Sequence, residues 1–212
     1  MRLAMPPSSP RPAEVSPDAD RDDRCTVVGR RPPGFRLITG FSPLEEQQAI
    51  ERWIVAHFHW DKRNCGPLPP CEQYPGDGAI PDWAETLGRR MVELGIFQRE
   101  PDHVLVRRYE RGRGVRPHVD RKSYGPTVAG LTLVSSRMFH LTHPSLRSRL
   151  ETLLLPGDLY VMSGPARYCW NHSIPSAMDD EFRGVRFPRT GGFSVTWRYA
   201  PRPAKRWWWF DS

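Results

Sequence analysis

The stretch that decides the fold is His103-Val-Leu-Val-Arg-Arg-Tyr-Glu110, followed by Val115-Arg-Pro-His-Val-Asp120. From Pro101 onward the apolar side chains recur with a period of two, which indicates strands with one buried face. Turns rich in Gly, Pro, Asp and Ser separate the segments. The pattern predicts these short strands: His103–Glu110, Val115–Asp120, Val128–Leu133, Met138–His143, Thr152–Leu155, Asp158–Met162, Tyr168–Ser173 and Phe193–Tyr199.

Two helices are predicted upstream of these strands. Ser42-Pro-Leu-Glu45 has the form of a capping box, and the apolar residues after it follow a helical period to about His57. Asp82-Trp-Ala-Glu85 repeats this form and predicts a helix over Asp82–Leu94. Helices followed by short strands indicate an α+β, mainly β, fold with an antiparallel sandwich or barrel as its body. The second helix is expected to bury a face made of Trp83, Leu87, Met91 and Leu94.

The two ends of the chain differ from this body. Residues 1–33 are rich in proline and poor in large apolar side chains. Such a segment buries too little surface to offset its ordering entropy, so we predict a disordered extension. Residues 203–212 form an aromatic tail containing three consecutive tryptophans. We expect this tail to fold back onto the barrel rather than form an exposed interaction patch.

The composition is that of a globular chain of 212 residues, with 38% hydrophobic and 26% charged residues. No apolar run approaches the roughly 18 residues of a membrane-spanning helix, and the N-terminus has no apolar signal segment. The four cysteines form no CxxC pair. We therefore expect a monomeric cytoplasmic protein with no membrane partner. The net charge of +7 makes nucleic acid a candidate partner, although a GC-rich codon bias, which favours arginine, also explains it.

A metal-binding pattern lies on the second of the two opening strands. Residues i and i+2 of a strand share a face, so His118 and Asp120 are expected to converge. His172, on a later strand, supplies a second imidazole. Two histidines and one carboxylate with open positions form the facial triad of non-haem Fe(II) oxygenases. A lone HxD pattern also arises by chance, and ordinary surface or core histidines remain the alternative among seven histidines.

The last predicted strand carries a polar stripe. Ser194, Thr196 and Arg198 share one face, while apolar residues occupy the other. An arginine facing a dry core would be costly. The stripe therefore either lines a cavity that holds a carboxylate, which arginine grips with two parallel hydrogen bonds, or faces water.

Several segments in register resemble the AlkB family of Fe(II)/2-oxoglutarate dioxygenases. The resemblance covers about Phe35 to Pro201 and is strongest from Val104 onward. Several motifs in the same order are far more specific than any one of them. The segments are Val104–Tyr109, Gly112–Asp120, Tyr124–Leu133, Gly157–Met162, Arg167–Ile174 and Gly192–Arg198.

The resemblance implies a double-stranded β-helix, or jelly roll, over residues 103–202, with the helices and a substrate-facing lid in residues 34–102. It implies that His118, Asp120 and His172 hold Fe(II) and that O2 and 2-oxoglutarate are co-substrates. Tyr109 and Arg198 match positions that bind the carboxylates of 2-oxoglutarate. Ser194 and Thr196 are expected beside them.

The chain departs from the family in its arginines. The family's last strand usually carries two arginines six residues apart, and here Gly192 stands in place of the first. Arg107 stands where the family usually has asparagine, two residues before Tyr109 and on the same strand face. We expect Arg107 to compensate for the lost arginine, with Arg189 as the next candidate. The alternative is that Arg107 points to solvent and 2-oxoglutarate binding is impaired.

The substrate-facing residues also differ. Lys122 stands where DNA-repair members often have an acidic residue, and the family's aromatic lid segment is absent. Trp60 and Tyr74 could stack on a base, although aromatic loop residues are more often packing residues. These differences put the repair of alkylated DNA in doubt without affecting the iron chemistry.

The function expected from the resemblance is oxidative demethylation of alkylated bases in DNA or RNA, through hydroxylation of an N-methyl group and loss of formaldehyde. A base in a duplex would have to be flipped out to react. The alternative keeps the enzyme but changes the substrate to a protein side chain or a small molecule. A non-catalytic binding module is a third possibility, against which the three intact iron ligands argue.

Overall fold

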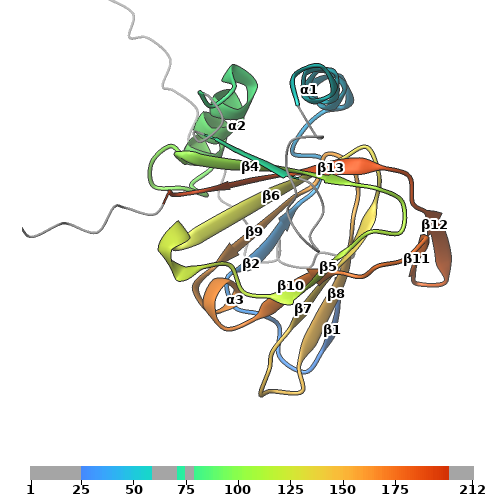
Figure 1. Cartoon of the computed structure of the whole chain (residues 1–212). Coiled ribbons are helices and arrows are strands. Elements are labelled where there is room, and N and C mark those ends of the chain that lie inside the picture. The colour runs from blue at the N-terminus through green and yellow to red at the C-terminus, as the bar shows by residue number, and fades with distance from the viewer. Residues whose placement is uncertain (1–24, 59–70, 75–78, 201–212) are drawn as a thin grey trace, which may run out of the picture.

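The computed structural model describes residues 25–58, 71–74 and 79–200. Two antiparallel sheets face each other and form the body of the molecule (Figure 1). The strands are β1 (Cys25–Val28), β2 (Phe35–Ile38), β3 (Cys71–Tyr74), β4 (His103–Tyr109), β5 (Val115–His118), β6 (Thr127–Leu133), β7 (Arg137–Thr142), β8 (Arg149–Leu154), β9 (Leu159–Ser163), β10 (Asn171–Ile174), β11 (Asp179–Phe182), β12 (Val185–Pro188) and β13 (Gly192–Arg198). The helices are α1 (Leu44–His57), α2 (Asp82–Glu93), α3 (Gly164–Tyr168) and the short 3-10 helix η3 (Lys122–Tyr124).

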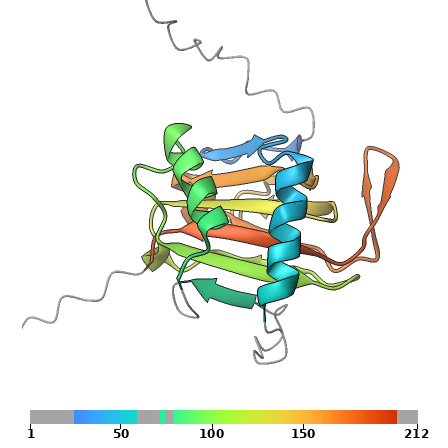
Figure 2. The same ribbon diagram turned by 90° about the horizontal axis from the view of Figure 1, so that it is seen from above.

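The strand order is that of a jelly roll. The larger sheet runs β2-β9-β6-β13-β4-β3 and the smaller runs β1-β8-β7-β10-β5, while β11 and β12 form a separate hairpin. The hairpin projects from one side of the body (Figure 2). The expected α+β, mainly β, jelly-roll fold is therefore confirmed. None of the helices in the described part of the chain is long and apolar enough to cross a membrane.

The two long helices lie across the outer face of the larger sheet (Figure 2). Ile50 and Ile54 of α1 and Leu87 and Met91 of α2 are buried in the apolar cluster that joins the helices to the sheet. Leu94, which we expected on this face, is 54% exposed. It follows the end of α2, where the helical periodicity that would carry it to the sheet has stopped.

Neither predicted capping box is formed. An extended proline, Pro43 or Pro81, occupies the N-cap of each helix, so neither N-terminus has a side-chain cap. Ser42 therefore lies one residue before the N-cap position and cannot cap the helix. Its hydroxyl donates instead to the carboxylate of Glu46 at 2.7 Å. Asp82 lies inside the first turn, where its charge favours the helix dipole.

Two further local expectations are wrong, and one hairpin was not predicted. Residues 25–28 of the expected disordered extension form β1, which pairs with β8; residues 1–24 lie outside the described part of the chain, as does the aromatic tail. Tyr168 ends the short helix α3 instead of beginning a strand. The hairpin β11–β12 was not expected. Its two turn residues, Arg183 and Gly184, both adopt a positive φ, and the first is an arginine where Asn, Asp or Gly is usual.

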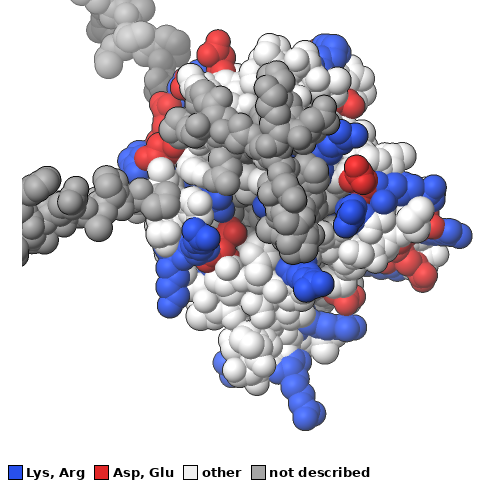
Figure 3. All heavy atoms as spheres, viewed as in Figure 1, with Lys and Arg blue, Asp and Glu red and all other residues white. Residues whose placement is uncertain are grey.

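Strand alternation divides the core into two layers. On β6, Ala129 and Leu131 face the helices, whereas Val128 faces the smaller sheet. On β13, Val195 and Trp197 belong to the helix side. The residues between them therefore face the space between the sheets, and that space holds the polar groups described below. Figure 3 shows Lys and Arg side chains on several sides of the face seen in Figure 1.

Candidate metal centre and co-substrate pocket

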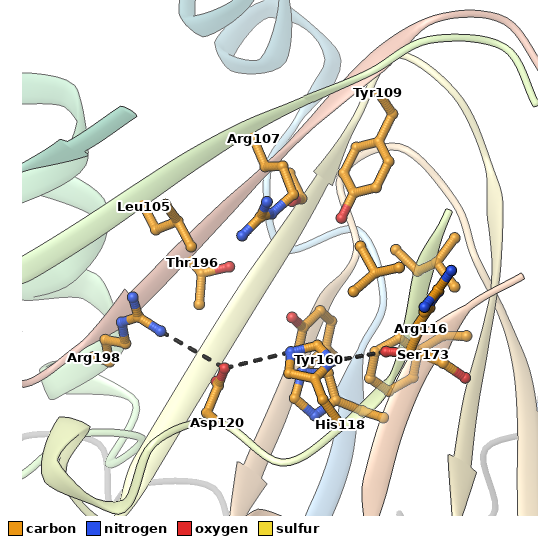
Figure 4. A pocket seen from close by; sticks show the side chains of 15 residues that line it. Leu105, Arg107, Tyr109, Arg116, His118, Asp120, Tyr160, Ser173, Thr196 and Arg198 are labelled. Carbon is orange, nitrogen blue, oxygen red and sulfur yellow. Dashed lines mark hydrogen bonds and ion pairs between the residues drawn. The ribbon is translucent and has the colours of Figure 1, made fainter. Parts of the chain in front are cut away.

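The structure brings the three predicted metal ligands together. β5 and β10 pair so that His118 and His172 are direct partners, and their rings lie 4.2 Å apart between centroids. Asp120 follows the end of β5 and turns back toward the two rings (Figure 4). One ligand atom from each of the three residues lies within 4.8 Å of the others. The arrangement comes from two strands that are far apart in the sequence.

The donor set and its hydrogen bonds fit a divalent iron. The Nδ1 of His118 lies 2.9 Å from the carbonyl oxygen of Arg116, a contact in which Nδ1–H donates and Nε2 remains free for metal. Burial lowers the pKa of His172 to about 4, which keeps its imidazole neutral and able to bind metal. The contact with Asp120 raises the pKa of His118, so metal binding at this ring competes with a proton. Two imidazoles and a carboxylate are the ligands of a non-haem Fe(II) site.

The charge of Asp120 is held by its neighbours. Burial alone would raise its pKa, but the contact with His118 and the charge of Arg198 lower it below its usual range. The Nη1 of Arg198 lies 3.7 Å from Oδ1 of Asp120. The carboxylate is therefore ionised at neutral pH and available to a cation.

A cavity of about 270 Å³ opens beside the triad. Its walls include the polar stripe of β13 and the facing side chains of β4 (Figure 4). The strand register places Ser194 opposite Arg107 and Gly192 opposite Tyr109. The cavity residues that we expected to bind co-substrate are Arg107, Tyr109, Ser194, Thr196 and Arg198.

Comparison with known proteins decides the family. The model of the 2OG-Fe(II) oxygenase superfamily matches residues 54–198. The chain belongs to this superfamily. It is 39% identical over 196 residues to the mouse alpha-ketoglutarate-dependent dioxygenase alkB homolog 7, mitochondrial, with 85% of each chain covered. The oxygenase is thus AlkB-like, uses Fe(II), O2 and 2-oxoglutarate (alpha-ketoglutarate), and is a 2-oxoglutarate-dependent dioxygenase.

Two further similarities describe the range of this family. The zebrafish probable RNA/DNA demethylase ALKBH6 is 26% identical over 210 residues, with 83% of this chain and 89% of that protein covered. The solved structure of OsALKBH1 has a TM-score of 0.59 and 17% identity, covering 80% of this chain and all of that one. At that identity the solved structure supports the jelly-roll fold alone.

Arg198 lies deep in the pocket of the oxygenase. It is 5% exposed, and its Nε donates to Nδ1 of His103 at 3.2 Å. Its guanidinium carbon lies 3.5 Å from the centroid of the Tyr124 ring. These contacts leave its terminal nitrogens facing Asp120, so Arg198 can bind an anion next to the metal position.

Arg189 does not line the pocket. Its Nε and Nη2 each donate to the carboxylate of Asp180 at 2.5 Å, and its Nη1 donates to the carbonyl of Pro175 at 2.7 Å. This buried pair anchors the β11–β12 hairpin to the loop before β13. Arg189 is therefore not available as a substitute for the arginine missing at Gly192.

Two residues that support or line the site were not singled out from the sequence. Arg167 is fully buried and donates to the carbonyls of Asp120 and Arg121 at 3.0 and 2.8 Å, so it holds the loop that carries the Asp120 ligand. Tyr160 lines the cavity, and burial raises its pKa. Both belong to segments that carry the family resemblance, which was the available signal. Their roles depend on which loop they reach, and the sequence pattern does not specify this.

The expected substrate-facing residues have different outcomes. Trp60 lies outside the described residues. Tyr74 is 6% exposed and packs edge-on against Phe58 at 5.9 Å in the core beneath the helices, so it does not face the pocket. Its position on β3, beside β4, explains this placement. Lys122 is exposed on η3, close in sequence to Asp120 but not on the cavity wall.

Proposed function

We propose that this dioxygenase oxidatively demethylates alkylated nucleic-acid bases. The observation that carries the proposal is that the triad lines a small cavity and has exposed basic side chains close to it in the sequence. The cavity would hold the co-substrate, so a methyl group would approach the triad from the open side. The iron, with 2-oxoglutarate and O2, would supply the oxidising chemistry.

The protein's own residues bind and orient the reactants. His118, Asp120 and His172 would hold iron on one face and leave the other face open. Arg198 would bind the carboxylate next to the metal. Tyr109 would donate from the far end of the cavity, because burial raises the pKa of its hydroxyl and keeps it protonated.

Charge around the triad supports a polyanionic substrate. Arg113, Arg116, Arg121 and Lys122 are all exposed and flank the two ligands of the HxD segment. Cationic side chains around a reaction site attract phosphate backbones and speed their association. The similarity to a protein named as a probable RNA/DNA demethylase points the same way.

A protein or small-molecule substrate is the second candidate. Lys122 favours it, because this position departs from DNA-repair members of the family. The buried position of Tyr74 also removes one of the two aromatic residues considered for stacking on a base. This candidate differs from the first in the substrate only, since both use the same iron chemistry.

Succinate release distinguishes these possibilities. The Fe(II)-loaded protein is incubated with 2-oxoglutarate, with and without oligonucleotides that carry N-methylated bases. The proposal requires faster succinate release with the methylated strand than with the unmethylated one, together with formaldehyde. Turnover that no oligonucleotide stimulates would favour the second candidate, and no turnover at all would indicate a binding module.

A further inference from the structure

Arg137, the first residue of β7, is a buried cation in the space between the two sheets. It shares a strand face with Phe139, which lines the co-substrate cavity, and with Leu141. Only 1% of the Arg137 surface is exposed. The strand pattern explains why the side chain points inward, but not why this inward position carries a charge.

The guanidinium of Arg137 has no hydrogen-bond partner among the described residues. Its Nε, Nη1 and Nη2 are all buried and unpaired. The nearby acid, Asp180, already gives both oxygens to Arg189. A buried charge without a partner is strongly unfavourable, so such a group indicates a missing anion. Burial lowers the pKa of Arg137 only to about 10, and the group remains charged at neutral pH.

The position of this guanidinium is that of the arginine missing from β13. A Cβ atom added at Gly192 would lie 2.9 Å from Nη2 of Arg137. Gly192 is in turn the register partner of Tyr109, whose ring centroid lies 4.4 Å from the guanidinium carbon. The space that we expected Arg107 to fill is therefore filled from the opposite sheet by Arg137.

We propose that Arg137 binds the distal carboxylate of 2-oxoglutarate together with Tyr109. Arg198 lies at the metal end of the cavity, beside Asp120, and Arg137 lies at the Tyr109 end. A dicarboxylate that extends between them would place one carboxylate at each arginine. Arg137 lies just behind the cavity wall, with the Tyr109 ring against it, so this ring must shift when the carboxylate binds.

The test compares two keto acids that differ only at the distal end. 2-Oxopentanoate has the keto acid and five carbons of 2-oxoglutarate, with a methyl group in place of the distal carboxylate. Binding to the Fe(II) protein is measured by calorimetry without oxygen. Arg137→Met should weaken 2-oxoglutarate binding by at least about tenfold and change 2-oxopentanoate binding by less than about twofold. Arg107→Met is the matched variant on the cavity wall.

Thermal unfolding separates ligand binding from a structural role. Removing an unpaired buried cation should raise the melting temperature of the ligand-free Arg137→Met protein. The further rise that saturating 2-oxoglutarate gives the parent should largely disappear. If the methionine variant does not fold, Arg137→Lys, which keeps the charge, should retain selectivity for the dicarboxylate.

Three results would overturn the proposal. The first is unchanged 2-oxoglutarate binding in Arg137→Met. The second is an equal loss for both keto acids, which would mean a structural role. The third is a selective loss in Arg107→Met and none in Arg137→Met, which would assign the distal carboxylate to Arg107.

Discussion

Arg167 shows how a single side chain can hold a metal ligand without touching metal. Its two donated hydrogen bonds go to backbone carbonyls in the Asp120 loop. We expect Arg167→Met to weaken Fe(II) binding by about tenfold to a hundredfold, because the loop loses its anchor. Metal titration of the purified protein measures this. Arg121→Met is the control: only the Arg121 backbone accepts a bond, and an equal effect in both variants would refute the positioning role.

A substitution at His118 can remove activity while leaving the fold intact. The side chain of His118 is 41% exposed, so its removal leaves little cavity. We expect His118→Ala to abolish 2-oxoglutarate turnover and to change the free energy of unfolding by less than about 1 kcal/mol. Succinate release and urea denaturation provide the two measurements. Full turnover in this variant would remove His118 from the metal site.

His103 gives the fold a dependence on pH. Its pKa is lowered to about 4, first by burial and then by the charge of Arg198. The unfolded chain, with a histidine pKa of about 6.5, binds more protons between these values. The stability contributed by neutral, buried His103 is therefore fully present above pH 6.5, and it is lost as the pH drops toward 4. His172 shares this shift and contributes to the same window.

The variant His103→Gln tests this dependence. A glutamine carbonyl can still accept the bond from Nε of Arg198, but it does not titrate. The free energy of unfolding, measured by urea denaturation, should fall less between pH 7.5 and pH 5 in the variant than in the parent. The two decreases should differ by about 2 kcal/mol. An unchanged difference would mean that other groups cause the acid sensitivity.

At the scale of elements, β1 belongs to the fold. It pairs with β8 at four positions, from Cys25 opposite Thr152 to Val28 opposite Arg149. Deleting residues 1–28 should lower the free energy of unfolding by about 1–3 kcal/mol, because β8 then becomes an uncovered edge. Deleting residues 1–24 keeps every contact among the described residues and is the matched control. Thermal unfolding of the two truncations checks the difference, and equal melting temperatures would contradict the role of β1.

The success of sequence-based prediction differed from element to element for physical reasons. The strands after Pro101 could be predicted because one face of each is buried, which imposes a period of two. The strand β1 lies at a sheet edge with mostly exposed residues, so it carries no such period. The caps were misplaced because a proline, rather than the polar residue next to it, occupies the N-cap.

At the scale of the whole molecule, the candidate site depends on which strands face each other. The convergence of His118 and Asp120 was expected from strand alternation, although Asp120 lies beyond the end of β5 in the structure. The pairing with His172 was implied by family resemblance. Arg137 could not be found in this way. Its proximity to Gly192 joins the smaller sheet to the larger, and no spacing within one strand encodes that contact.

The position of β5 at the edge of its sheet has a consequence for the metal-free protein. Among the described strands β5 pairs with β10 alone, and the pairing is irregular between His172 and Ile174. Iron held by His118 and His172 would link this edge strand to its neighbour. The amide hydrogens of Val115, Arg116 and His118 should therefore exchange with deuterium more slowly after Fe(II) is added, and chelation should reverse the effect. Equal exchange rates with and without iron would contradict this link. An iron-starved cell would then contain a protein with a loosened strand edge, which is open to pairing with other chains, so its solubility would depend on the iron supply.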